Sequence, residues 1–173
     1  MIEKFVDWFE ITDRFVDWEE YLKTTEVIVE LINCNIYHGI KQNKLDFVYG
    51  IPRGGLIPAT ILSYKFNIPI LNYTSQDIIT EPEKKLICIV DDILDSGKTL
   101  DGTLHMLLSR GFKNFVVFTL FAKPKGILYF LNSSWKDINY YIKEIPNDLW
   151  IHFPYEQNPV VKDSLSNVKQ PGT

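Results

Sequence analysis

A continuous apolar run at residues 86–90 constrains this chain more than any other feature of its sequence. The run reads Leu-Ile-Cys-Ile-Val and is mostly β-branched. It predicts a central strand that is buried on both faces of a parallel sheet. A stretch with helical character follows at 98–110 and is stopped by Gly111, and a second apolar run follows at 115–121. This succession of strand, helix and strand is typical of the crossover units of an α/β fold.

The rest of the chain repeats this alternation, which favours one α/β domain with a parallel sheet flanked by helices. A length of 173 residues fits a single domain over 1–173. Residues 73–85 are polar and lack an apolar period, so we expect a loop that closes over a ligand. The other expected elements are helices at 18–33 and 56–66 and short strands at 47–49, 68–71, 140–142 and 150–153.

The segment that carries the chemistry follows the first apolar run directly. Asp91 and Asp92 stand at the expected carboxyl end of the strand, which is where ligands of such sheets bind. Adjacent carboxylates are costly there unless they meet a cation or hydroxyl groups, which suggests a sugar diol with Mg²⁺ close by. Free N–H groups at the start of the next helix attract a phosphate. The residues expected to hold that phosphate are Ser96, Gly97, Lys98 and Thr99.

Two other interpretations of this segment are weaker. Asp95 or Ser96 could simply cap the helix, which would be the better interpretation of a lone Asp-Ser-Gly. The Gly-Lys-Thr at 97–99 also invites comparison with the ATP-binding P-loop, whose first glycine should lie five positions earlier. Asp92 stands at that position, and a carboxylate is the wrong group where backbone must wrap a triphosphate.

The acidic pair and the turn after it resemble the signature of type I phosphoribosyltransferases, and the resemblance extends over about residues 18–156. It implies that the chain transfers 5-phosphoribosyl from phosphoribosyl pyrophosphate to a base, with Mg²⁺ as cofactor. Asp91 and Asp92 would bind the ribose hydroxyls and, through these hydroxyls or water, the metal. Residues 95–99 would bind the 5-phosphate.

A second stretch is similar to the pyrophosphate loop of the same family. Residues 51–55 read Ile-Pro-Arg-Gly-Gly. The resemblance implies that Arg53 and Gly54 contact the pyrophosphate and that the Pro52–Arg53 peptide is cis. A cis peptide before a residue other than proline costs about 3 kcal/mol, so this expectation needs a structure to test it.

Residues later in the chain are similar to the base-binding parts of the 6-oxopurine branch of the family. The resemblance implies that Lys123 meets the purine 6-oxo group. Trp150 would stack on the purine, and Ile151 would offer backbone groups to its edge. Asp95 would act at N7 as general base or hydrogen-bond acceptor, since this branch carries an acid there. Taken singly, a lysine is more often solvated and a tryptophan more often part of a core.

The resemblance also sets expectations for the segments around the site. Residues 122–156 would form a base-binding hood, residues 1–17 an extension without counterpart, and the polar residues 157–173 a mobile tail. The loop at 73–85 takes the place of the family's catalytic lid but is shorter and lacks its usual Ser-Tyr pair. His152 stands where a close relative carries an acid, which leaves the choice among xanthine, guanine and hypoxanthine open. Relatives are commonly dimers or tetramers.

Composition excludes several other classes of protein. The formal net charge is −4, with 18 basic and 22 acidic residues and no basic block, so we expect no nucleic-acid partner. No apolar run reaches the roughly 18–20 residues of a membrane span, and the first residues lack the pattern of an export signal. We therefore expect a soluble cytoplasmic protein that binds no membrane. Cys34 and Cys88 are too few for a disulfide framework or a four-cysteine metal site and are expected as buried free thiols.

A non-catalytic regulator that keeps the fold and binds nucleotide or RNA is the main alternative in another functional class. The short loop at 73–85 favours it. Asp95 and the absence of a basic stripe count against it. A transferase that acts on another base is a nearer alternative.

Overall fold

The structure is a computed structural model that describes residues 13–33, 45–72, 79–136 and 139–156. The chain groups into two compact units: the larger is Thr24–Asn147, and the smaller joins Met1–Lys23 to Asp148–Thr173. Four expectations fall wholly or partly outside the described residues: the mobile tail at 157–173, most of the N-terminal extension at 1–17, the first half of the loop at 73–85, and the thiol of Cys34.

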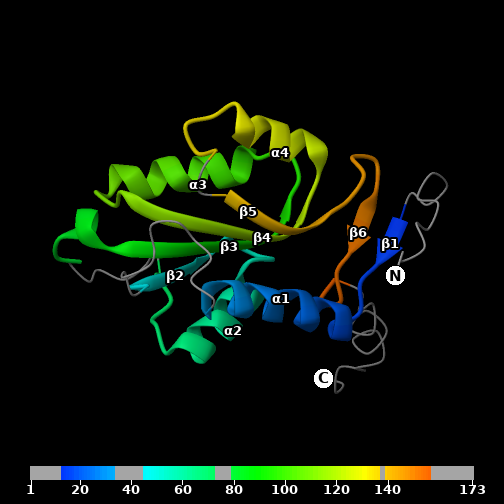
Figure 1. The fold of residues 1–173 in the computed structure, drawn as a ribbon, viewed down its shortest axis with the longest axis horizontal. Coiled ribbons are helices and arrows are strands. Elements are labelled where there is room, and N and C mark those ends of the chain that lie inside the picture. Colours follow the sequence, from blue (N-terminus) through cyan, green and yellow to red (C-terminus); the bar gives the residue numbers. More distant parts are fainter. Residues whose placement is uncertain (1–12, 34–44, 73–78, 137–138, 157–173) are drawn as a thin grey trace, which may run out of the picture. The chain divides into compact units, whose positions relative to one another are not determined.

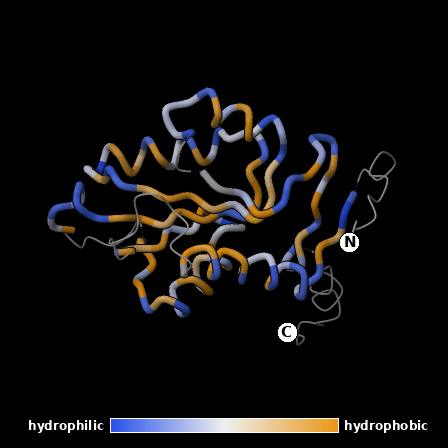
Figure 2. Tube along the Cα trace, in the orientation of Figure 1, coloured by the Kyte–Doolittle hydropathy of each residue, from blue (hydrophilic) through white to orange (hydrophobic). Residues whose placement is uncertain are grey.

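A four-stranded parallel sheet forms the middle of the larger unit, in the order β2-β3-β4-β5. Its strands are β2 (Phe47–Gly50), β3 (Leu86–Leu94), β4 (Asn114–Ala122) and β5 (Asn139–Glu144). β3 and β4 are hydrophobic along most of their length (Figure 2), as expected of central strands. The predicted α/β fold with a parallel sheet is confirmed.

Helices cover both faces of this sheet (Figure 1). α3 (Lys98–Ser109) and α4 (Pro124–Leu131) lie on one face, and α2 (Leu56–Phe66) lies on the other. α1 (Trp18–Asn33) spans the boundary between the two units. The helices predicted at 18–33 and 56–66 are confirmed, and the one predicted at 98–110 ends one residue earlier. None of the helices in the described part of the chain is both long and apolar enough to cross a membrane.

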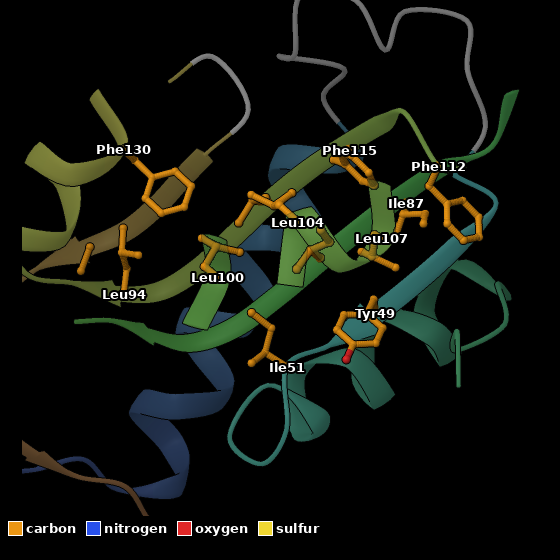
Figure 3. Packing of buried hydrophobic residues seen from close by; sticks show 13 residues of the cluster. Tyr49, Ile51, Ile87, Leu94, Leu100, Leu104, Leu107, Phe112, Phe115 and Phe130 are labelled. Carbon is orange, nitrogen blue, oxygen red and sulfur yellow. The ribbon is translucent and has the colours of Figure 1, made fainter. Parts of the chain in front are cut away.

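One apolar cluster fixes α3 on the sheet (Figure 3). Leu100, Leu104 and Leu107 recur at helical spacing, are almost fully buried, and pack in the same cluster as Ile87 and Ile89 of β3. Each such side chain contributes roughly 1.5–3 kcal/mol through its burial. Because this row begins in the first turn of α3, the cluster holds the start of that helix beside the carboxyl end of β3.

Two strand predictions differ from the structure. Residues 68–71 form only an isolated bridge, Val48↔Ile70, where a strand was expected. Pro69 lies inside this segment and has no N–H to donate, so the pairing is confined to two hydrogen bonds with Val48. β3, in contrast, continues past residue 90 to Leu94 and so includes both acidic residues of the candidate site.

α4 is an element that the sequence pattern did not predict. Its apolar residues 127–131 run consecutively without a helical period, and Gly126 is a poor helix former. Pro124 occupies the first turn, where proline is well tolerated because its missing N–H would have no partner there. α4 follows β4 directly, so its first turn also lies at the carboxyl edge of the sheet.

The smaller unit contains two short parallel strands, β1 (Asp13–Phe15) and β6 (Trp150–His152). The rings of Phe15 and His152 stack with their centroids 4.6 Å apart, and His152 Nε2 lies 3.2 Å from Asp13 Oδ1. A strand was predicted at 150–153, whereas β1 was missed because three residues with one apolar side chain carry no period. Part of the N-terminal stretch 1–17 thus pairs with a segment near the other end of the chain.

Cys88 lies in β3 between Ile87 and Ile89 and is fully buried. Burial raises the pKa of its thiol to about 12. The expectation of a buried free thiol is confirmed for this cysteine.

Candidate active site

A pocket of about 270 Å³ lies at the carboxyl ends of β2 and β3. Two segments that lead from a strand into a helix line it, and we call them the two turns. The first is residues 51–54 before α2, and the second is the end of β3 with the residues that follow it, 91–97, together with Thr99 and Leu100 at the start of α3. Thr119 of β4 also borders it. Open α/β sheets bind ligands at this edge, and every residue of the lining belongs to the larger unit.

The turn between β2 and α2 brings a cation and closely packed backbone to the pocket. The Pro52–Arg53 peptide is cis, as predicted. The side chain of Arg53 is exposed and lines the pocket. Gly54 lies directly against the other turn, because a Cβ built on it would overlap the carboxylate of Asp92. Only a residue without a side chain fits between the two turns here.

The acidic pair at the end of β3 is partly buried and lines the pocket. Asp91 Oδ1 accepts a hydrogen bond from the backbone N–H of Asp92 at 2.9 Å. Burial, together with the negative charge of Asp92, raises the pKa of Asp91 well above its usual range. An anion at Asp91 is therefore unfavourable until hydroxyl donors or a cation arrive, which is the behaviour expected of a ligand-binding carboxylate.

The start of α3 offers backbone N–H groups to an anion. Gly97 precedes the helix with a φ of 82°, and no described side chain caps this helix in the usual way. The Ser96 hydroxyl lies 3.5 Å from the N–H of Lys98, which is longer than an ordinary hydrogen bond. Ser96, Gly97 and Thr99 line the pocket, whereas the exposed side chain of Lys98 does not. A phosphate is the kind of ligand that such a helix start favours.

Asp95 pairs with two lysines from the start of α4. Its Oδ1 lies 3.2 Å from Lys123 Nζ and 2.8 Å from Lys125 Nζ. Partial burial of Asp95 opposes its ionisation, but the hydrogen bonds and charges of Lys125 and Lys123 outweigh it and hold the pKa of Asp95 below its usual range. Asp95 is therefore suited to accept hydrogen bonds as an anion and poorly suited to remove a proton as a strong base.

The larger unit thus gathers most of the predicted site residues. Those that line the pocket are Arg53, Gly54, Asp91, Asp92, Asp95, Ser96, Gly97 and Thr99. Lys98 begins α3 beside them, and the buried Lys123 reaches Asp95. Trp150 and Ile151 belong to the smaller unit, where Trp150 is 58% exposed and Ile151 is buried. Their contact with a base stays a prediction.

Two residues of this region were missed at the level of sequence. Lys125 was overlooked because α4 was not predicted, and without that helix nothing places a second lysine near Asp95. Thr119 did carry a signal, since it is the only polar residue in the apolar run at 115–121. A single threonine is common in strands, so the signal is weak until the pocket is seen.

Comparison with known protein families gives an independent finding. The family model described as phosphoribosyl transferase domain matches residues 70–157, about half of the chain. The matched segment includes β3, α3 and β4, and so contains the acidic pair and the start of α3.

Three individual proteins are similar over much of this chain. The xanthine-guanine phosphoribosyltransferase of Idiomarina loihiensis is 26% identical over 168 residues, which cover 87% of this chain and 91% of the relative. The enzyme of the same name from Cereibacter sphaeroides is 35% identical over 126 residues, with 63% of this chain and 68% of the relative covered. A crystal structure of a purine phosphoribosyltransferase from Pyrococcus horikoshii superposes with a TM-score of 0.62 at 26% identity and covers 87% of this chain and 98% of that one.

Proposed function

This chain belongs to the phosphoribosyl transferase domain family, and from that premise we propose that it is a purine phosphoribosyltransferase. It transfers 5-phosphoribosyl from phosphoribosyl pyrophosphate to a 6-oxopurine (xanthine, guanine or hypoxanthine) and releases pyrophosphate and a nucleoside monophosphate. The names of the similar proteins support this substrate class. One observation carries the proposal: a single pocket is lined by a cationic turn, by an acidic pair and by the start of a helix.

The sugar phosphate is bound by the turn between β3 and α3. Asp91 and Asp92 accept hydrogen bonds from the ribose hydroxyls, which supplies the partly buried Asp91 with hydrogen-bond donors. The backbone N–H groups from Ser96 to Thr99 receive the 5-phosphate at the start of α3. The sugar is then held at both ends, so that its C1 is presented in one orientation.

The pyrophosphate is received by the turn between β2 and α2. When the bond between C1 and pyrophosphate lengthens, positive charge grows on the sugar and negative charge grows on the leaving group. Arg53 and the backbone around Gly54 line the same pocket and stabilise that negative charge. The turn with Arg53 therefore lies at the negative part of the transition state, and the turn with the carboxylates lies at the positive part.

Mg²⁺ fits this site as an ion that arrives with the substrate. The described residues include no group of three or more side chains that could hold a metal on their own. Mg²⁺ commonly uses one or two carboxylates together with water and substrate phosphates, and Asp91 and Asp92 supply two carboxylates. The ion would neutralise charge on the pyrophosphate, and these two aspartates would hold it through the ribose hydroxyls or water.

Asp95 orients the purine. As an anion paired with Lys123 and Lys125, it accepts the hydrogen bond of the purine N7–H and so favours the tautomer whose other ring nitrogen attacks C1. The N7 proton becomes acidic as that nitrogen bonds to C1, and it passes to the Asp95 carboxylate when pyrophosphate leaves. Lys123 is the donor for the 6-oxo group, and its pairing with Asp95 supports a location beside the base. Trp150 would stack on the purine and Ile151 would bind its edge.

Several finer assignments belong to the same proposal. We expect a homodimer or homotetramer in the cytoplasm that acts in purine salvage and binds neither nucleic acid nor membrane. The net charge of −4 without a basic block is consistent with the absence of a nucleic-acid partner.

The proposal is tested by mixing the protein with Mg²⁺, phosphoribosyl pyrophosphate and each base in turn, and by measuring nucleotide and pyrophosphate. We expect product with at least one 6-oxopurine. Asp95→Asn should lower kcat by about 100-fold while the protein stays folded at the assay temperature, as followed by circular dichroism.

Glu26→Gln is the matched control, because Glu26 pairs with Lys65 at 3.1 Å outside the pocket and its change should leave kcat unaltered. Unchanged turnover of Asp95→Asn would refute the role of Asp95. Binding of nucleotides without turnover of any base would instead identify a non-catalytic regulator.

A further inference from the structure

Thr119 of β4 carries a hydroxyl group that the fold does not need. The side chain is fully buried, and its Oγ1 has no hydrogen-bond partner in the described part of the chain. A buried hydroxyl without a partner costs free energy, and valine would fill nearly the same space without that cost. Thr119 borders the pocket, which suggests that its hydroxyl serves a ligand-bound state.

The pairing of β3 with β4 places this hydroxyl beside the acidic pair. Three successive residue pairs share one face of the two strands, because side chains alternate along a strand. They are Ile87↔Phe115, Ile89↔Val117 and Asp91↔Thr119. The first two pairs belong to the apolar cluster under α3, whereas the third is polar and borders the pocket. Neighbouring strands lie about 4.8 Å apart, so the side chains of Thr119 and Asp91 are cross-strand neighbours.

The Asp91 carboxylate accepts a 2.9 Å hydrogen bond at Oδ1 from the backbone N–H of Asp92. The donor of that bond belongs to β3 itself. A second donor, on a neighbouring strand, could fix the orientation of the Asp91 carboxylate relative to the pocket. A donor on β4 is placed to do so, and Thr119 is the β4 residue paired with Asp91. A hydrogen bond from a hydroxyl to an ionised carboxylate is among the stronger ones in proteins.

We infer that Thr119 is a positioning residue: when phosphoribosyl pyrophosphate binds, the Thr119 hydroxyl donates to the Asp91 carboxylate and turns it toward the ribose hydroxyls. The role rests on the proposed function, since it requires a ribose at Asp91. Because Thr119 acts through Asp91, loss of its hydroxyl should weaken binding of phosphoribosyl pyrophosphate and leave binding of the base unchanged.

The test compares Thr119→Val, which removes the hydroxyl at nearly constant size, with Thr119→Ser, which keeps it. Binding of phosphoribosyl pyrophosphate with MgCl₂ is measured by calorimetry on the full chain, together with both KM values and thermal unfolding. Thr119→Val should raise the Kd and KM for phosphoribosyl pyrophosphate about tenfold, which is about 1.4 kcal/mol, and leave the KM for the base within twofold. Its unfolding temperature should equal or exceed that of the wild type, and Thr119→Ser should restore binding to within twofold.

Val117→Thr is the matched control, because it adds a buried hydroxyl one step earlier on the same face of β4, outside the pocket lining. It should lower the unfolding temperature and leave the KM for phosphoribosyl pyrophosphate unchanged. The inference is overturned if Thr119→Val binds like the wild type, if Thr119→Ser is as weak as Thr119→Val, or if Thr119→Val unfolds at a clearly lower temperature. A wild-type protein that binds no phosphoribosyl pyrophosphate would refute the proposed function itself, and the role of Thr119 with it.

Discussion

The two turns that line the pocket occupy equivalent places, each between a parallel strand and the helix that follows, yet they present opposite chemistry. The turn before α2 offers the cation of Arg53 and bare backbone at Gly54, whereas the turn before α3 offers three carboxylates between residues 91 and 95. Each turn also needs a glycine, for different reasons. Gly54 is required by a functional group, the Asp92 carboxylate, whereas Gly97 is required by its own backbone and by the packing of α4.

The comparison predicts that Gly54→Ala has the largest effect of any change in these turns. Its new Cβ would overlap the Asp92 carboxylate and push apart the groups that receive the sugar and the pyrophosphate. We expect kcat/KM to fall by about 100-fold or more, because displacements of about 1 Å at a reacting centre cost that much. Steady-state kinetics and thermal unfolding measured together would show a loss of activity that exceeds the loss of stability.

Gly102→Ala provides the control for this change. Gly102 is exposed within α3, and a Cβ there would meet no atom within 4 Å. Alanine should stabilise the helix by roughly 0.5–1 kcal/mol and leave activity alone. Equal kinetic losses in both glycine variants would show that Gly54 has no special place against Asp92.

Gly97→Ala should act on stability before activity. A φ of 82° is unfavourable for alanine, and the new Cβ would lie 2.7 Å from Tyr129 Cδ1. We expect the free energy of unfolding to fall by about 1–3 kcal/mol, measured in a denaturant titration. If the protein keeps its full stability and still loses phosphate binding, the distinction drawn between the two glycines is wrong.

Lys125→Met should have the smallest effect on activity. It tests whether Lys125 helps to keep Asp95 ionised. Asp95 is anionic down to low pH because its pKa is lowered, so its protonation, and any loss of activity from it, occurs only as the pH falls through that value. Removal of Lys125 raises the pKa of Asp95 toward its usual range, and the acid limb of the pH profile of kcat moves to higher pH. Since the side chain of Asp95 is 45% exposed, the shift is small, and we expect at most about a twofold loss near pH 4 and little change at pH 6 and above.

Lys65→Met removes a comparable lysine, which pairs with Glu26 outside the pocket, and should leave the pH profile in place. A profile of Lys125→Met that coincides with the wild type would mean that Lys123 alone sets the charge of Asp95.

The two turns also differ in how well their structure could be predicted from the sequence. The turn before α3 was predicted in detail because strand, acids and helix start are consecutive, so that neighbours in sequence are neighbours in the pocket. The turn before α2 and its cis peptide were predicted only through a family resemblance, since Pro-Arg-Gly-Gly by itself indicates a turn and no ligand. Helices α2 and α3 were predicted within one residue because Gly55, Gly97 and Gly111 mark their limits.

The parts that escaped prediction depend on contacts between distant segments. Lys125 meets Asp95 only because α4 follows β4, and α4 has an apolar pattern without a period. The burial of Thr119 beside Asp91 depends on the register of two strands, which local sequence does not fix. β1 was missed because its three residues become a strand only through β6, more than 130 residues away.

The buried thiol of Cys88 can report on the opening of the central strand β3. Because its thiol ionises only near pH 12 in the folded chain, alkylating reagents cannot attack it at neutral pH while β3 stays between β2 and β4. The rate of its alkylation, measured by mass spectrometry, therefore reports how often the sheet opens around β3. A substrate that ties both turns together should make those openings rarer and slow the labelling of a sulfur atom that it never touches.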